Sequence, residues 1–252
     1  MPISMHHELH ALYNWFDNEP TLRCAIVTGQ GRAWSAGADL KEWNQSHESA
    51  KASKSSPQER SMPPSGFAAL SRRSGKKPII AAVNGLAYGG GMEALANLDL
   101  IIAARSASFA LPEVKRGVVA LAGALPRIAR TIGRPRAMEM ALTGRTVSAA
   151  EALSWGLVNA VTDDYPVDGE IMERPVVKKA LEYAEMICAN SPDSVIVSRA
   201  GVIQGWEDGS AENGTRVANE VWGKRLQEGE NIKEGVRAFV EKREPRWVPS
   251  KL

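Results

Sequence analysis

The sequence predicts an α/β protein with a helical C-terminal part, and two observations carry this prediction. Short apolar runs at 24–28, 79–83 and 98–103 have the length of buried strands and alternate with segments of helical periodicity. Runs that are apolar on both faces are typical of parallel strands covered on both sides. After about residue 190 the strand pattern stops and only helical periodicity remains.

The first predicted helix covers 4–18, where apolar side chains recur at helical spacing behind Ser4, a residue type that caps helix N-termini. The polar, Ser-rich segment 44–66 predicts a surface loop. We therefore expect a core over 1–190 and a helical subdomain over 191–252. Further helices are predicted over 135–143, 149–155, 175–189, 192–206, 213–227 and 231–243, with another strand over 158–161.

Composition excludes several classes of protein. The 252 residues carry a formal net charge of +2, which provides no general attraction to nucleic acid or to an anionic membrane. No apolar run approaches the roughly 20 residues that a membrane span requires. Two cysteines cannot build a disulfide framework, so a reducing compartment is expected.

The last three residues are Ser250, Lys251 and Leu252. A C-terminal Ser-Lys-Leu is a peroxisomal address read by an import receptor. The start of the chain lacks the charged and apolar regions of a secretory signal. We therefore expect a peroxisomal protein whose partners include that receptor.

Metal and nucleotide motifs fail on their spacing. His7 and His10 flank Glu8 in an H-E-x-H pattern, whereas the zinc motif needs two histidines four residues apart. The Gly29 loop lacks the third glycine of a dinucleotide site, and no phosphate-binding loop or nucleophile elbow is present. The sequence therefore predicts no metal and no redox cofactor.

Three segments remain that carry chemistry, at 35–41, 89–96 and 109–113, and each follows a predicted strand. In the second, three glycines precede a helix rich in Ala and Leu. Glycines let a ligand approach the main chain, and the first N–H groups of a helix have no internal partners. Such N–H groups stabilise a developing anion.

Two carboxyl groups accompany these loops. Glu93 falls in the first turn of the helix after the glycines, and Glu113 lies among apolar residues. Burial among apolar groups raises the pKa of a carboxyl group and allows it to act as an acid. Two such groups beside N–H donors suit acid–base chemistry next to a carbonyl, with an enolate formed in transit.

These segments resemble the enoyl-CoA hydratase/isomerase (crotonase) family, and the likeness runs from about residue 5 to 247. It implies a ββα spiral core with a helical C-terminal trimerisation subdomain, hence a homotrimer or a dimer of trimers. The substrate it implies is an acyl-CoA thioester, with no added cofactor. The matching stretches are WSAGADLKEW (34–43), KPIIAAVNGLAYGGGMEALANLDLIIA (77–103), FALPEVKRGV (109–118), ALTGRTVSAAEALSWGLVNAV (141–161) and GVRAFVEKREPRW (235–247).

The resemblance also implies roles for single residues. Ala38 and Gly90 stand where family members place the two oxyanion-hole N–H groups, and Glu93 and Glu113 stand where hydratases keep their catalytic glutamates. The implied reaction is addition of water to a 2-enoyl-CoA, with Glu93 activating the water and Glu113 protonating C2. The residues implied to contact CoA or the acyl thioester are Ala36, Ala38, Asp39, Leu40, Lys41, Gly90 and Lys242.

Two departures from the family pattern stand out. The strand pair that usually precedes the first helix is missing, and the region 120–124 reads Ala-Leu-Ala-Gly-Ala where hydratases commonly have a glycine-rich stretch. A Δ3,Δ2-enoyl-CoA isomerase, which needs only Glu113, remains an alternative, as does a non-catalytic acyl-CoA-binding member. Leu121 occupies the position where dienoyl-CoA isomerases have Asp. The pathway stays open between fatty-acid oxidation and a fungal secondary-metabolite or siderophore branch.

Overall fold

The computed structural model describes residues 1–39 and 61–252. These residues form two compact units. The first comprises 1–14, 26–74 and 79–181, and the second comprises 15–25, 75–78 and 182–252. Most of the predicted loop 44–66 lies outside the described residues, and its described end, 61–66, contains no helix or strand.

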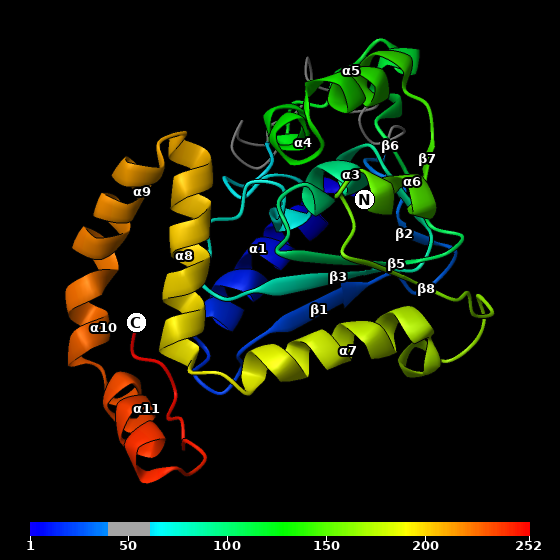
Figure 1. The fold of residues 1–252 in the computed structure, drawn as a ribbon. Coiled ribbons are helices and arrows are strands. Elements are labelled where there is room, and N and C mark those ends of the chain that lie inside the picture. Colours follow the sequence, from blue (N-terminus) through cyan, green and yellow to red (C-terminus); the bar gives the residue numbers. More distant parts are fainter. Residues whose placement is uncertain (40–60) are drawn as a thin grey trace. The chain divides into compact units, whose positions relative to one another are not determined.

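The first unit is built on two four-stranded sheets. One has the order β1-β3-β5-β8, formed by β1 (Ala25–Thr28), β3 (Ile79–Val83), β5 (Leu100–Ala104) and β8 (Ala160–Thr162). Its strands lie side by side in Figure 1, and β3 and β5, like β5 and β8, run parallel. Every residue of β3 is buried, as expected for a strand that is apolar on both faces. All four strands were predicted to within two residues.

The second sheet has the order β2-β4-β6-β7 and consists of strands of two or three residues. β2 and β4 run parallel, as do β4 and β6, while β6 and β7 are antiparallel. From β1 to β6 the chain alternates between the two sheets, so each pair of strands forms one turn of a spiral. The strands are β2 (Ala33–Ser35), β4 (Leu86–Tyr88), β6 (Ser108–Ala110) and β7 (Val147–Ser148).

The helices of the first unit include three that were predicted. They are α1 (Ile3–Asn18), which continues into the second unit, α5 (Arg134–Thr143) and α6 (Ala149–Ser154). Ser148 and Glu151 form a reciprocal capping box at the start of α6. Two helices next to the predicted chemistry are α3 (Gly90–Leu95) and α4 (Ala124–Ile132), and α4 was not predicted.

The second unit is helical over its long C-terminal segment, as predicted. Ser191 caps α8 (Pro192–Asp208), and α7 (Pro175–Cys188) spans the boundary between the units. The prediction of a single continuous helix over 213–227 is wrong. The structure has α9 (Ala211–Ala218), a π turn (Asn219–Gly223) and α10 (Lys224–Glu228), and the last helix is α11 (Glu230–Glu241).

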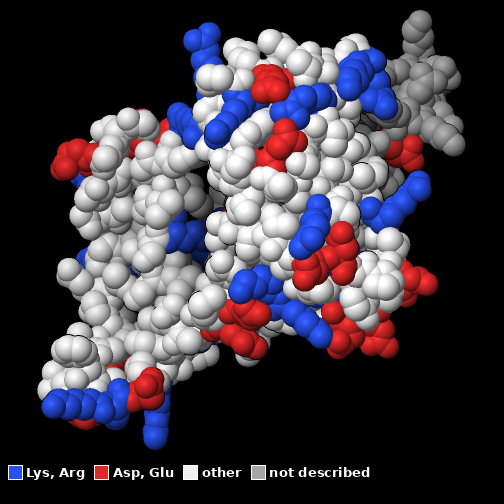
Figure 2. All heavy atoms as spheres, turned by 45° about the vertical axis from the view of Figure 1, so that its right-hand side comes forward, with Lys and Arg blue, Asp and Glu red and all other residues white. Residues whose placement is uncertain are grey.

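No helix among the described residues has the length and apolar character needed to cross a membrane. On the face drawn in Figure 2, Lys and Arg side chains are interspersed with Asp and Glu, in line with the small net charge. Assembly into a trimer or hexamer stays a prediction.

Candidate active site

The three segments with predicted chemistry meet at one edge of the second sheet. Ala36 follows β2, Gly89 follows β4, and Leu111 follows β6. These strands are parallel, with Ser35 opposite Ala87 after a register shift within β2, and Tyr88 opposite Ala110, so their carboxyl ends lie together. The loops that leave these strands therefore begin side by side.

This placement corrects one part of the sequence analysis. The segments were attached directly to the strands at 24–28, 79–83 and 98–103, but a short strand of the second sheet precedes each of them. These strands, β2, β4 and β6, have three residues each, too few for an alternation pattern to stand out from loop sequence.

The two predicted oxyanion loops contact each other through glycines. An ideal Cβ atom at Gly37 would lie 3.4 Å from the Gly90 nitrogen and 3.0 Å from the Tyr88 carbonyl oxygen. Gly37 and Gly89 also have positive φ angles, 93° and 57°, which L side chains rarely adopt. Glycine at these positions lets the Ala38 and Gly90 segments approach closely.

A cavity of about 1000 Å³ opens beside these loops. It is lined by both predicted oxyanion residues, Ala38 and Gly90, and by both predicted glutamates, Glu93 and Glu113. The remaining lining is mainly apolar, with Arg72 and Arg116 among the exceptions. The structure thus brings the four residues around one volume large enough for an acyl thioester.

Glu93 is held in a buried position by the main chain. Its side chain comes from the first turn of α3, the residue is 5% exposed, and its Oε2 accepts a hydrogen bond of 3.3 Å from the Ala124 N–H. Burial, reinforced by the negative charge of Glu113, raises the pKa of Glu93 to about 7, although main-chain hydrogen bonds from Ala122, Gly123 and Ala124 oppose the rise.

Glu113 lies in the first turn of the 3₁₀ helix Pro112–Arg116. Its Oε1 is 3.4 Å from the position of an ideal Cβ at Gly89, so its carboxyl group faces the glycine loop. Oε2 is buried and has no hydrogen-bond partner within 1–39 and 61–252. Burial raises the pKa of Glu113, while the nearby Arg116 counteracts the rise.

The residues predicted to contact CoA are only partly described. Ala36 and Ala38 line the cavity, and Asp39 is exposed, with its N–H donating to the Met1 carbonyl at 3.3 Å. Leu40 and Lys41 lie outside the described residues. Lys242 follows α11 in the second unit, with a φ of 52°, and its contact with CoA stays a prediction.

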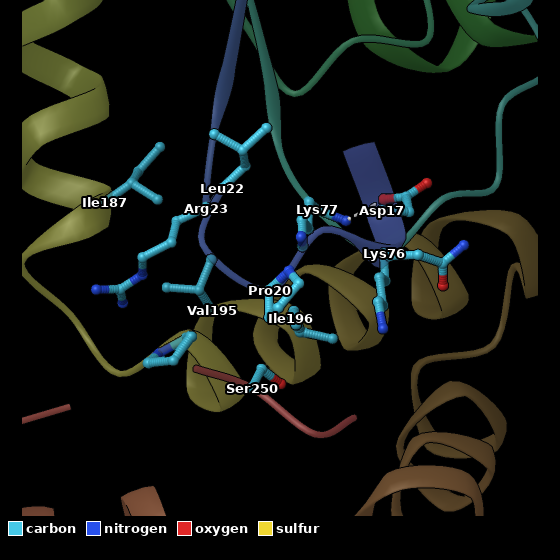
Figure 3. A pocket seen from close by; sticks show the side chains of 12 residues that line it. Asp17, Pro20, Leu22, Arg23, Lys76, Lys77, Ile187, Val195, Ile196 and Ser250 are labelled. Atoms are coloured by element: carbon cyan, nitrogen blue, oxygen red, sulfur yellow. Dashed lines mark hydrogen bonds between the residues drawn. The ribbon is translucent and has the colours of Figure 1, made fainter. Parts of the chain in front are cut away.

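The C-terminal tripeptide lies in the second unit. Ser250 lines a cavity of about 30 Å³, which also contacts Ile196 and Lys77 and has room for little more than a water molecule (Figure 3). Lys251 pairs with Glu230 at 2.5 Å, and a carboxylate oxygen of Leu252 accepts a hydrogen bond from Lys76. Peroxisomal import through this tripeptide stays a prediction.

Sequence reasoning missed the residues that support the site. Phe67 lines the cavity and packs against Gly90, and the Ala122–Ala124 main chain faces the Glu93 carboxyl group. Phe67 directly follows the polar, Pro-containing segment that was predicted as a surface loop over 44–66, so no periodic pattern indicated its role. Gly123, whose φ is 123°, is the sequence feature from which a tight turn before α4 could have been inferred.

The arrangement suits a particular class of chemistry. Two carboxyl groups of raised pKa can hold and exchange a proton near neutral pH. N–H groups of two loops at the same cavity can stabilise negative charge on a carbonyl oxygen. Together they can add or remove a small nucleophile and a proton across the carbon–carbon bond next to a thioester.

Comparison with known proteins agrees with this geometry. Residues 2–249 match the family described as enoyl-CoA hydratase/isomerase. The mevalonyl-coenzyme A hydratase SIDH of Beauveria bassiana is 52% identical over 253 residues, covering 100% of this chain and 88% of that protein. The mevalonyl-coenzyme A hydratase sidH of Aspergillus fumigatus is 46% identical over 245 residues, covering 97% and 85%.

Solved structures show the same fold. The enoyl-CoA hydratase EchA1 from Mycobacterium marinum superposes with a TM-score of 0.80 at 32% sequence identity. The match covers 97% of this chain and 88% of that one. The spiral of two sheets and the C-terminal helices are therefore features that this chain shares with solved hydratases.

Proposed function

We propose a substrate for this chain, which belongs to the enoyl-CoA hydratase/isomerase family and is an enoyl-CoA hydratase, a hydro-lyase. The enzyme interconverts mevalonyl-CoA with a 2-enoyl thioester. That thioester forms when mevalonyl-CoA loses its C3 hydroxyl as water. The identities of 52% and 46% to two mevalonyl-coenzyme A hydratases support this substrate. The observation that carries the chemistry is that Glu93 and Glu113 line one cavity with the Gly90 loop.

In the hydration direction, Glu93 takes a proton from water as the water oxygen bonds to C3. The electron pair of the C2–C3 double bond moves toward the carbonyl and gives an enolate whose charge lies on the thioester oxygen. The N–H groups of Ala38 and Gly90 stabilise that oxygen, and Glu113 delivers a proton to C2. Loss of one oxyanion donor typically lowers turnover about 10²–10³-fold.

Dehydration runs through the same groups in reverse. Glu113 removes the proton from C2, and Glu93 protonates the departing C3 hydroxyl, which leaves as water. The pair ends each reaction with the same total number of protons as it had at the start, since one carboxyl group gains what the other loses. No net proton is released, but hydration leaves the proton on Glu93, so it has to pass to Glu113, directly or through water, before the next turnover in the same direction.

The cavity lining supports a branched, hydroxylated acyl group. Val118, Val119 and Leu121 offer apolar surface for the methyl branch at C3. Tyr88 and His7 line the same cavity and offer polar atoms for the terminal hydroxyl of the mevalonyl chain. The Tyr88 hydroxyl is held by the hydroxyl groups of Ser108 and Thr146, and His7 Nε2 contacts the Ser61 carbonyl oxygen. A substrate hydroxyl that reaches these ordered polar groups gains a hydrogen bond that a straight apolar acyl chain cannot make.

The test is a comparison of substrates. We expect kcat/KM for dehydration of mevalonyl-CoA to exceed that for 3-hydroxybutyryl-CoA at least about tenfold, the discrimination typical of one or two added contacts. Glu113→Gln is the matched negative control in the same assay. A preference for the straight-chain thioester would overturn the proposed substrate, and an unchanged Glu113→Gln rate would overturn the proposed mechanism.

A further inference from the structure

His6 is a buried histidine outside the cavity lining. It belongs to α1, is 1% exposed, and its Nδ1 accepts a hydrogen bond of 2.9 Å from the Ala68 N–H. Its ring packs edge-on against the ring of Phe67, with centroids 4.7 Å apart and planes at 62°. Its neighbour His7 is exposed and lines the cavity, so the two histidines have different surroundings.

The main chain that His6 contacts is strained. Ala68 and Ala69 have φ angles of 52° and 54°, in the left-handed region that non-glycine residues avoid. Two successive residues persist in such a conformation only where surrounding contacts hold them. The Ala68 N–H is bound by His6, and the Phe67 N–H donates to the Ser71 hydroxyl at 2.8 Å.

The strained segment connects to both halves of the site. The Phe67 ring lies against the α carbon of Gly90, because an ideal Cβ there would be only 2.4 Å from Phe67 Cδ2. The Ser71 hydroxyl donates to the Ala122 carbonyl at 2.8 Å, within the turn that leads to the Ala124 N–H bound to Glu93. A shift of this segment therefore displaces Gly90 directly and the turn that holds Glu93 indirectly.

We propose that His6 is a positioning residue, whose Nδ1 fixes the Phe67–Ala69 turn and, through the Phe67 ring, aligns the Gly90 N–H with the thioester oxygen. The proposal rests on the oxyanion role of Gly90 in the proposed function. Nδ1 is an acceptor, so the neutral ring carries its proton on Nε2. Burial lowers the pKa of His6 to about 4, which keeps the ring in this neutral form at neutral pH.

Three substitutions separate positioning from simple packing. His6→Leu keeps an apolar side chain but removes the acceptor. His6→Asn places an amide oxygen near the position of Nδ1, and His6→Gln moves that oxygen one bond farther out. Tyr13→Leu is the matched control, because Tyr13 is buried on the same helix and its ring faces the Arg73 guanidinium.

The first readout is steady-state hydration of a 2-enoyl-CoA, normalised to the folded fraction. A displaced oxyanion donor weakens the transition state more than substrate binding, so we expect His6→Leu and His6→Gln to lower kcat about 10- to 100-fold with KM changed less than about threefold. His6→Asn should recover most of the rate. Tyr13→Leu should lower the melting temperature and leave kcat close to wild type.

The second readout is the absorption band of bound cinnamoyl-CoA, which moves to longer wavelength as its carbonyl is polarised. We expect the shift in wild type, His6→Asn and Tyr13→Leu, and a smaller shift in His6→Leu and His6→Gln. If wild type is active, a wild-type rate and a full absorption shift in His6→Leu or His6→Gln would overturn the positioning role. An equal loss of rate in His6→Asn and His6→Gln would overturn it as well. Absence of both activity and shift in wild type would instead overturn the proposed function.

Discussion

The ring of Phe67 occupies the space in which a side chain at residue 90 would begin. An ideal Cβ at Gly90 lies 2.4 Å from Phe67 Cδ2 and 2.7 Å from Cγ, far inside van der Waals contact. Glycine is therefore required at this position by packing as well as by the need for a ligand to reach the main chain. The oxyanion loop and the aromatic ring form one closely packed unit.

Gly90→Ala should consequently impair both stability and catalysis. Overpacking of this kind typically costs about 1–3 kcal/mol of unfolding free energy, and displacement of an oxyanion donor lowers kcat about 10²-fold or more. Thermal unfolding and steady-state hydration measure the two effects. The matched control is Gly31→Ala in the same unit, since a Cβ at Gly31 meets no atom within 4 Å. Wild-type kcat in folded Gly90→Ala would contradict the account.

Most of the first sheet could be predicted from the sequence, because its strands are apolar on both faces. Ile79–Val83 is fully buried, and a short apolar run of this kind between turn residues is typical of a central strand in an α/β chain. The sequence also singled out both glutamates and both glycine loops, because glycine runs and isolated carboxyl groups in apolar sequence are uncommon. The structure places them around one cavity, and their catalytic roles stay a prediction.

The second sheet and its support were not predictable, for physical reasons. The three-residue strands Ala33–Ser35, Leu86–Tyr88 and Ser108–Ala110 owe their conformation to pairing with each other rather than to local pattern. The turn at Phe67–Ala69 depends on a hydrogen bond to His6, 62 residues away in sequence. Contacts of this kind exist only once the tertiary structure has formed.

The pH dependence of kcat/KM should be bell-shaped and the same for hydration and dehydration. The active form is the pair Glu93–Glu113 with one proton, and the overall reaction releases none. Because burial raises the pKa of Glu93 to about 7, kcat/KM should fall as the pH rises above about 7 and this last proton is lost. At lower pH, kcat/KM should fall again because Glu113 also becomes protonated. Burial raises the pKa of Glu113, so this fall should begin above the ordinary carboxyl pKa of 4.5.

Initial rates in both directions from pH 4 to 10 check this profile, with pH-independent stability confirmed by preincubation. Glu113→Gln removes the negative charge that helps to raise the pKa of Glu93 and leaves one titrating carboxyl group. Its residual activity should therefore follow a single ionisation. A profile that is flat across pH 5–8 in wild type, or one that keeps two ionisations in Glu113→Gln, contradicts a shared-proton pair.

Glu93→Gln should stabilise the protein at alkaline pH while abolishing most activity. The pKa of Glu93 is about 7 in the folded chain and 4.5 ordinarily, so the folded state favours the neutral carboxyl group. The shifted pKa of Glu93 therefore contributes roughly 3 kcal/mol to the free energy of unfolding. This contribution is complete below pH 4.5 and is lost as the pH rises through about 7. Glutamine stays neutral throughout.

The melting temperature of Glu93→Gln should thus exceed that of wild type by several degrees at pH 8, and the gap should close toward pH 4.5. Glu151→Gln is a suitable contrast, because hydrogen bonds from Ser148 lower the pKa of Glu151 and its ionised form favours folding. That variant should lose stability at pH 8. If the difference in melting temperature between Glu93→Gln and wild type did not change with pH, the Glu93 carboxyl group would not be buried in the way described.

The most direct measurement of the central claim is the hydration rate of Glu93→Gln, Glu113→Gln and the double variant, followed with ¹⁸O-labelled water to identify the product. If the two carboxyl groups act as one unit across the alkene, each single substitution lowers kcat about 10²–10⁴-fold and the double variant is little worse than either. Wild-type protein places ¹⁸O at C3. Retention of wild-type kcat by either single variant, or migration of the double bond without ¹⁸O incorporation, contradicts the account.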